Sequence, residues 1–266
     1  GGCRRVECES FHLSENVGGR IRLGAEDMNK NGQKQELHTG TETEKLSAAL
    51  PFWGKLSDAE QKLVREHTIV RVFDKNSTVF SRGSECLGFI RVLSGSVRTF
   101  LTSEEGREIT LYHLRAGEDD VLSASCVVSQ ITFDTQMEAE EKSRILIVPS
   151  IVLARLKENN IYVRCMIYEL LTRRFSDVTW TFQEVLFLRI DQRIASWIVQ
   201  TCEQTGSTEI TVIHDQIARD INTAREVVAR MIRRLAEEGM LRAGRGRIHV
   251  TDMNMLKKLC VNCRQE

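Results

Sequence analysis

The amino-acid sequence predicts an α+β chain built from an antiparallel β-domain, a long helix, and a C-terminal helix-turn-helix followed by a two-stranded wing. Three observations predict this order. Short β-rich segments separated by turn residues fill 69–148, and apolar residues then recur at helical spacing from about 161 to 189. Beyond them, 214–250 reads as two helices joined by a tight turn and followed by a hairpin. Strands grouped in one part of the chain and helices in another, without regular alternation, are typical of α+β proteins.

Composition restricts the possible functions. The 266 residues include 37 basic and 37 acidic side chains, so a nucleic-acid surface would have to come from local sorting of charge. The sequence has no run of about 18 apolar residues and no signal-peptide pattern, which argues against a membrane partner. Eight cysteines lie far apart, as expected in a reducing cytoplasm and not in a disulfide scaffold.

The first 45 residues are poor in apolar side chains, and we expect them to form a disordered tail. Two short helices are predicted over 46–68, broken at Leu50-Pro51, and Ser57 with Glu60 three residues later forms a capping box. Short strands at regular spacing then predict an antiparallel barrel or sandwich, which completes a domain over 46–150. The predicted strands are 69–73, 78–80, 88–93, 96–101, 109–113 and 144–148.

One helix of about 161–189 dominates the helical region 151–190. Five apolar residues follow a 4-3-4-3 spacing along it, which places them on one seam that suits a second copy of the helix. The alternative is a helix packed on its own β-domain. We favour a homodimer. The predicted dimerisation residues are Leu171, Phe175, Val178, Phe182 and Val185.

The region 191–255 reads as a DNA-binding module. Asp191 is placed as the N-cap of a first helix, and a strand over 209–213 follows. Next come helices over 214–220 and 224–238, the second ended by Gly239, and a hairpin of 240–242 with 247–250. This order is a helix-turn-helix with a wing. Residues 256–266 are expected to form a tail.

Charge is sorted locally in this module. Residues 222–250 contain seven arginines and three acidic residues, although the whole chain is neutral. Arg225, Glu226 and Arg230 fall in the N-terminal half of the second helix, where a helix in the major groove presents its side chains to bases. Arginine binds guanine O6 and N7, and glutamate accepts from cytosine N4. An ordinary solvated helix face is the alternative. The helix, turn and wing together favour double-stranded DNA as the partner.

At this point the sequence resembles the family of the cyclic-AMP receptor protein and the fumarate–nitrate regulator. The resemblance covers about 46–255. It rests on FSRG (80–83), FIRVLSGSV (89–97), EEGRE (104–108), RAGE (115–118), DQIAR (215–219) and REVVAR (225–230). The family implies a homodimer with a β-roll like a cyclic-nucleotide-binding domain, a long dimerisation helix, a palindromic promoter site and RNA polymerase as partner.

The DNA-binding residues carry over one by one. Arg225, Glu226 and Arg230 match the cyclic-AMP receptor type, whose half-site resembles TGTGA. Ile213 departs from the threonine or serine that often caps the first helix in the family. Expected phosphate contacts are His214, Arg219, Arg233, Arg245 and Arg247.

The sensing residues depart further from the family. Val121-Leu122 stands where the nucleotide pocket has Gly-Glu, and Phe133-Asp134 stands where it has Arg-Ser. With phenylalanine in place of the arginine and an added aspartate, this segment would repel a cyclic phosphate. Of the helix positions that meet adenine, now Val178 and Thr179, only half match. Cyclic AMP is therefore not the expected effector.

The effector stays unidentified, and haem and an iron–sulfur cluster stay open. Only Cys3 and Cys8 precede the β-domain as cluster ligands, and the axial candidates for haem are Cys86, His113 and Cys126, without a supporting motif. A zinc site needs four ligands, so Cys260-x-x-Cys263 predicts a mobile tail and no metal site.

Cys126 is the candidate redox sensor. It lies in Ser-Ala-Ser-Cys (123–126), where a lowered thiol pKa would make it reactive. The segment, with Ile-Thr-Phe-Asp (131–134), resembles a subgroup of uncharacterised regulators of the family. The alternative is a small buried residue of the β-domain.

Three classes of function compete. A DNA-binding transcription regulator controlled by an effector or redox signal accounts for most features. The alternative is a redox- or metal-sensing protein whose cysteines bind a cofactor and whose DNA binding is secondary. No nucleophile–base set, phosphate loop or carboxylate pair occurs at useful spacing, so no enzyme is expected and no catalytic residue is assigned.

Overall fold

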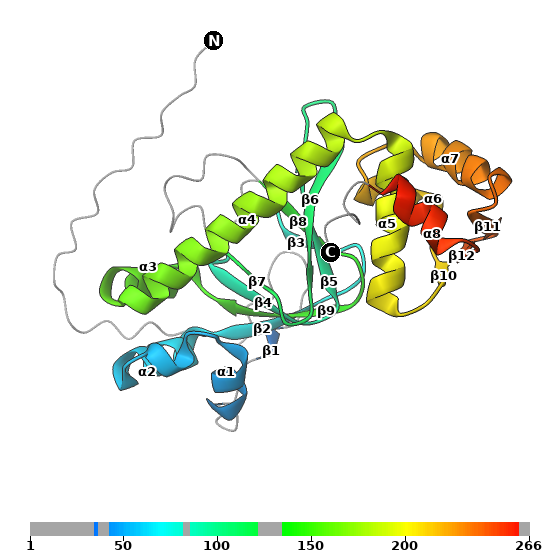
Figure 1. Cartoon of the computed structure of the whole chain (residues 1–266). Helices are drawn as coiled ribbons and strands as arrows, with labels where there is room; N and C mark the ends of the chain where they lie inside the picture. The colour runs from blue at the N-terminus through cyan, green and yellow to red at the C-terminus, as the bar shows by residue number, and fades with distance from the viewer. Residues whose placement is uncertain (1–34, 37–42, 82–85, 122–134, 261–266) are drawn as a thin grey trace, which may run out of the picture. The chain divides into compact units, whose positions relative to one another are not determined.

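The computed structural model describes residues 35–36, 43–81, 86–121 and 135–260 (Figure 1). Its elements follow the predicted order: a β-roll of two antiparallel sheets, a long helix, and a helical module with a small sheet. The predicted α+β class is therefore confirmed. Within the described ranges, none of the helices combines the length and the apolar character that crossing a bilayer requires.

Two sheets form the β-roll. One has the strand order β1 (Gln35–Glu36), β2 (Ile69–Phe73), β9 (Ser143–Val148), β4 (Phe89–Ser94), β7 (Asp119–Asp120). The other has the order β3 (Thr78–Phe80), β8 (Gln136–Ala139), β5 (Ser96–Thr102), β6 (Glu108–Arg115), which leaves β6 at an edge.

Strand β9 shows why this part of the sequence is so apolar. Ile145 and Ile147 point into the core between the sheets, whereas Leu146 and Val148 pack against the helices outside. Side chains alternate between the two faces of a strand, so a strand covered on both faces becomes a continuous apolar run.

A helical layer covers the outer face of the first sheet. It comprises α1 (Thr43–Ala49), a 3-10 turn (Trp53–Lys55), α2 (Asp58–His67) and α3 (Ser150–Asn159). The predicted capping box is confirmed, since Ser57 and Glu60 exchange both hydrogen bonds at the start of α2. Phe52 meets Phe89 of the sheet edge-on, with ring centroids 5.4 Å apart.

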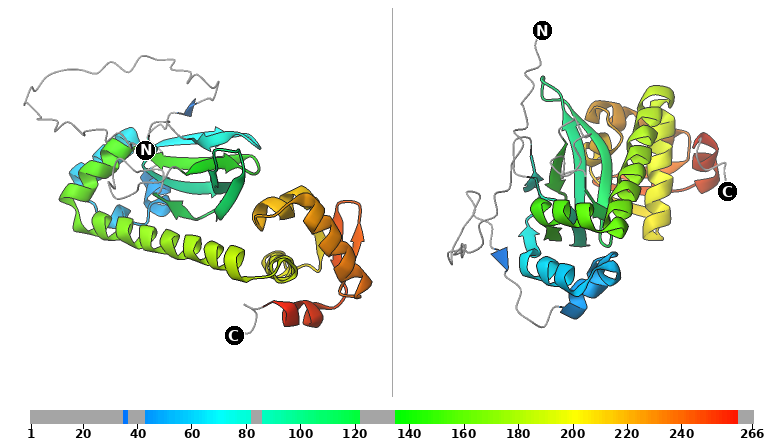
Figure 2. Two further views of the ribbon diagram at one scale, coloured as in Figure 1. Left: turned by 90° about the horizontal axis from the view of Figure 1, so that it is seen from above. Right: turned by 90° about the vertical axis from the view of Figure 1, so that its left-hand side faces the viewer.

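Helix α4 (Ile161–Phe187) runs beside the β-roll (Figures 1 and 2). The Asn160 side chain caps it by accepting from the N–H groups of Tyr162 and Val163. The same amide donates to the carbonyl of Lys55, which ties the start of α4 to the helical layer. The helix that connects the parts of the molecule is thus anchored at its N-terminus.

The C-terminal module follows α4. It contains α5 (Ile190–Thr205), β10 (Glu209–Thr211), α6 (His214–Asp220), α7 (Arg225–Glu237), β11 (Leu241–Gly244), β12 (Arg247–Val250) and α8 (Met253–Leu259). Its three strands form the sheet β10-β12-β11. Gly239, with φ of 79°, ends α7 in the left-handed conformation, as predicted. One apolar core unites α5, α6, α7 and α8.

Several local expectations differ from the structure. Strand β1 and the start of α1 lie inside the predicted tail, and strands β7 and β8 were not predicted. Helix α5 begins at Ile190, so Asp191 lies in its first turn, where it pairs with Arg189. Cys260 is buried against Ser196 and does not belong to an exposed tail.

Candidate nucleic-acid interface

The exposed face of α7 carries the predicted base-reading residues. Arg225, Glu226 and Arg230 are all exposed and occupy its first two turns, whereas Val228 and Ile232 are buried in the module core. The apolar face holds the helix on its module, because apolar residues three or four positions apart share one side of a helix and leave the charged residues on the other. The three side chains are therefore positioned on one solvent-facing surface.

The arginines of this face have few acidic partners. Arg225 pairs with Asp215 of α6 at 3.8 Å, and its side chain keeps 64% of its accessibility. Such an exposed pair is weak and salt-sensitive, so DNA phosphates or bases can replace it. Among the predicted phosphate contacts, Arg247 of the wing lies 3.3 Å from Glu209, and Arg219 lies 3.8 Å from Glu138 of β8.

The turn between α6 and α7 docks on the free edge of β6. The Asn222 side chain accepts from the Thr110 N–H at 2.7 Å and donates to the Thr110 carbonyl at 3.0 Å. An amide side chain thus takes the place of a neighbouring strand. Thr110 also donates from its hydroxyl to the carbonyl of Arg219 at 2.9 Å. Asn222 has φ of 55°, a left-handed conformation that asparagine tolerates better than most residues.

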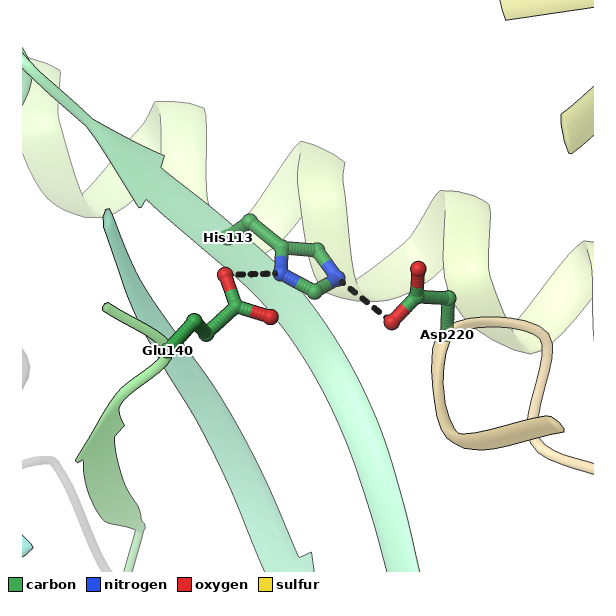
Figure 3. Close-up of side chains that lie close together, drawn as sticks. All are labelled: His113, Glu140 and Asp220. Atoms are coloured by element: carbon green, nitrogen blue, oxygen red, sulfur yellow. Dashed lines mark hydrogen bonds and ion pairs between the residues drawn. The ribbon is translucent and has the colours of Figure 1, made fainter. Parts of the chain in front are cut away.

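A histidine and two carboxylates meet beside this contact (Figure 3). His113 of β6 lies between Glu140, which follows β8, and Asp220, the last residue of α6. Nδ1 is 3.0 Å from Glu140 Oε2, and Nε2 is 3.8 Å from Asp220 Oδ1. Burial lowers the pKa of His113, but its contact with Glu140 and the charge of Asp220 raise it above its usual value overall. Burial raises the pKa of Asp220.

Arg174 links α4 to the β-roll. It lies on the buried side of α4 and bonds Asp120 through Nε at 3.2 Å and the carbonyl of Asp119 through Nη2 at 2.6 Å. Its guanidinium also stacks 4.7 Å from the ring of Tyr112, whose hydroxyl bonds Asp120. A movement of β7 would therefore displace α4 through the bonds of Arg174.

Much of the predicted dimerisation seam faces solvent in the single chain. Phe175 and Phe182 are 73% and 47% exposed, and Val178 and Val185 are partly covered. Leu171 packs partly against the β-roll cores. Leu186 and Phe187, which the 4-3-4-3 pattern omits, are 70% and 78% exposed at the C-terminal end of α4. An apolar surface of this kind on a helix indicates a partner.

The sensing candidates can be placed only in part. Cys126 and Phe133-Asp134 lie outside the described residues. Val121 is fully buried in the core beneath the helical layer, and Cys86 is half-buried. His113, a candidate axial ligand of haem, contacts two carboxylates instead.

Sequence reasoning missed the residues that join the modules. Asn222, Glu140 and Asp220 gave no signal, because their roles depend on contacts with residues far away along the chain. For Arg174 a signal existed: it continues the buried stripe Val163, Ile167, Leu170 at helical spacing. A charged residue on an apolar stripe needs a buried partner.

Two family models match the chain. The cyclic nucleotide-binding domain matches residues 70–160, and the Crp-like helix-turn-helix domain matches residues 192–259. These ranges coincide with the β-roll with α3 and with the C-terminal module.

Known proteins match over most of their length. The crystal structure of a protein described as a CRP/FNR-family transcriptional regulator from Eubacterium rectale ATCC 33656 is 32% identical, with a TM-score of 0.75 over 80% of this chain and 98% of that one. The cyclic AMP receptor protein of Thermus thermophilus is 26% identical over 79% of this chain and 96% of its own. The cAMP-activated global transcriptional regulator Vfr of Pseudomonas aeruginosa is 22% identical over 73% and 93%.

Proposed function

This chain belongs to the CRP/FNR family of transcription regulators, and we propose that it binds a palindromic, TGTGA-like promoter site as a homodimer under control of an effector or redox signal. The observation that carries the proposal is the exposed first half of α7, where Arg225, Glu226 and Arg230 share one surface. A helix held this way by its module enters the major groove with its N-terminal residues at the base edges.

Charge supports contact with the DNA backbone on both sides of α7. His214 and Arg219 lie on α6, Arg233 lies farther along α7, and the wing supplies Arg245 and Arg247. All but His214 are exposed. Phosphate contacts position a protein without reading sequence, whereas Arg225 and Arg230 would select bases.

Two-fold symmetry of the site follows from the dimer that we propose. The exposed apolar residues of α4 would pair with a second copy, and this would set the spacing of two α7 helices. Half-sites one helical turn apart can be read only at the matching spacing. RNA polymerase is the further partner that the family implies, and the cytoplasm is the compartment.

The β-roll is the proposed sensing domain, with an effector other than cyclic AMP. Two relatives are named for cyclic AMP, but this chain has Val121-Leu122 and Phe133-Asp134 where the nucleotide pocket holds ribose and phosphate. Cys126 remains the candidate thiol sensor. The alternative is a redox- or metal-sensing protein whose cysteines bind a cofactor and whose DNA binding is secondary. The cluster of Figure 3 supports the metal-sensing part of it but contains no cysteine.

Replacing Arg225 tests base reading. Arg225→Ala should weaken binding to a TGTGA-type duplex by about 1–3 kcal/mol, because a bidentate contact to guanine is lost, and should relax selectivity at one base pair. Fluorescence anisotropy with the full chain and two duplexes, specific and scrambled, measures both effects.

Arg233→Ala is the matched control, since we assign it to phosphate. It should weaken binding to both duplexes by similar factors and reduce the salt dependence. An Arg225→Ala variant that loses the same affinity for scrambled as for specific DNA would contradict the base-reading role.

A further inference from the structure

The strongest unassigned feature of the described residues is the cluster of His113, Glu140 and Asp220 between the β-roll and the helix-turn-helix (Figure 3). The three residues come from three separate elements, and one ligand atom from each lies within 4.8 Å of the others. Imidazole and carboxylate groups are ligands for divalent metal ions.

A neutral imidazole can donate a hydrogen bond to only one of the two carboxylates that flank His113. A neutral histidine has one N–H donor and one acceptor nitrogen, but both ring nitrogens of His113 face a carboxylate. With Nδ1–H donated to Glu140, the lone pair of Nε2 faces Asp220 Oδ1 across 3.8 Å. That gap is too long for a hydrogen bond and brings two electron-rich atoms together, unless a proton or a metal ion lies on Nε2. A cation between them would bind both.

The gap has the size that a metal ion needs. Bonds from zinc to nitrogen or carboxylate oxygen are about 2.0–2.2 Å, so two ligands of one ion can be as much as about 4 Å apart. The separation of 3.8 Å between Nε2 and Oδ1 falls within this span. Glu140 would hold Nδ1–H from the other side of the ring, which is how carboxylates commonly orient metal-bound histidines.

Access and charge also suit a cation. The side chains of His113, Glu140 and Asp220 are 26%, 24% and 13% exposed, so they are shielded but reachable. They line a cavity of about 690 Å³ bounded by α4, α5, α6 and β6, which gives an ion its route and leaves room for water ligands. Of the nearby arginines, Arg98 is engaged by Glu108 at 2.5 Å and Arg219 lies beside Glu138. Arg115 also lines the cavity and is the positive charge that acts against a cation at His113.

We propose that His113 Nε2 and the Asp220 carboxylate bind one divalent cation, with Glu140 orienting the imidazole and water completing the coordination. Because His113 belongs to β6 and Asp220 to α6, the ion would tie the helix-turn-helix to the β-roll in the arrangement described above. A metal ion would then control the position of the DNA-reading helix. The inference concerns binding to the free protein and does not depend on the proposed promoter site.

Titration of the metal-free full chain with Mn²⁺ tests the proposal. Electron paramagnetic resonance reports the free aquo ion, and Mn²⁺ prefers oxygen and nitrogen ligands, so the cysteines contribute little. We expect one ion per chain. Asp220→Asn and His113→Gln should each weaken binding about tenfold or more. Glu140→Gln, which keeps an acceptor for Nδ1–H, should weaken it less.

Matched controls separate the cluster from the rest of the surface. His249→Gln on the wing and Asp215→Asn on α6 change exposed residues of the same types and should leave Mn²⁺ affinity unchanged. Mn²⁺ should also raise the melting temperature of the wild-type chain but not of Asp220→Asn, because a ligand of the folded state stabilises it. No saturable binding, or equal binding by wild type and a folded Asp220→Asn, would overturn the proposal.

Discussion

At the scale of single residues, Asp119 shows how burial and ion pairing compete. Its carboxylate lies 3.1 and 3.2 Å from the Arg91 guanidinium, an arrangement that lowers the pKa of the acid. Burial has the larger effect and raises the pKa of Asp119 to about 6. The charged form of Asp119 is therefore destabilising in the folded protein, even with a partner arginine in contact.

A pH prediction follows from that shift. The unfolded-state pKa of an aspartate is about 3.9, so between pH 4 and 6 the folded state binds more protons than the unfolded state. The stability that Asp119 contributes is thus present at low pH and is lost as pH rises through about 6. Relative to Asp119→Asn, the wild-type free energy of unfolding should fall over this window and stay level above about pH 7.

Urea unfolding of both chains across the window measures the difference. Glu118→Gln, at the exposed neighbouring position, should run parallel to the wild type. A wild-type curve that stays parallel to that of Asp119→Asn from about pH 4 to 7 would show that Arg91 cancels the effect of burial, and one that rises would show that Arg91 outweighs it.

Residues also mark the limit of sequence reasoning. No strand was predicted at Asp119-Asp120, yet both side chains are buried in strand β7. The aspartates are satisfied by Arg91 and Arg174, which lie 28 and 54 residues away along the chain from their partners. The residues around Asp119 and Asp120 do not indicate that distant arginines will pair with them, so strand β7 could not be predicted from the sequence.

At the scale of elements, the bounds of helices with a regular apolar spacing were predicted accurately. Helix α6 has the predicted bounds His214–Asp220, and α7 differs by one residue at each end. Strand β8 was missed, since Gln136–Ala139 offers four residues of mixed polarity. It becomes a strand because β3 and β5 pair with it on both sides. Amphipathic helices contain their own signal, whereas short strands depend on neighbours.

Helix α4 packs one face on the β-roll and leaves apolar residues exposed on the other, where we propose the dimer seam. Phe182→Glu should dissociate the proposed homodimer, because each copy would bury an unpaired charge at a cost of about 3 kcal/mol or more. Sedimentation analysis of the full chain measures the mass. The substitution should not unfold the chain, since Phe182 is 47% exposed and outside the cores.

Gln183→Glu is the matched control, an exposed neighbour that is not one of the five seam residues. It adds the same charge to the same helix and should leave the dimer intact. A Phe182→Glu chain that keeps the mass of the dimer would refute the seam. A chain that is monomeric before any substitution would do the same.

At the scale of the whole molecule, β6 is the element on which the parts converge. It is an edge strand, and exposed edges are usually covered or blocked. Here Thr181 of α4 donates to the carbonyl of Leu111 at 2.7 Å, and Asn222 of the helix-turn-helix binds both backbone groups of Thr110. The β-roll, α4 and the C-terminal module thus meet along one short stretch of one strand. The sequence predicted the three modules but not this meeting point.

Asn222→Gly isolates the role of that contact. Glycine adopts the positive φ of the turn without strain, so the helix-turn-helix should keep its fold while both hydrogen bonds to Thr110 disappear. Hydrogen–deuterium exchange should then show faster exchange of the Thr110 amide in a peptide from β6. The buried helices of the C-terminal module should keep their protection.

Thr223→Gly, one residue farther along the turn, is the control. Its side chain makes no contact with β6 among the described hydrogen bonds, so β6 should stay protected. If Asn222→Gly leaves β6 as protected as in the wild type, the module is held to the β-roll by other contacts. The two hydrogen bonds of the Asn222 side chain would then be ruled out as the contact that holds the helix-turn-helix to β6.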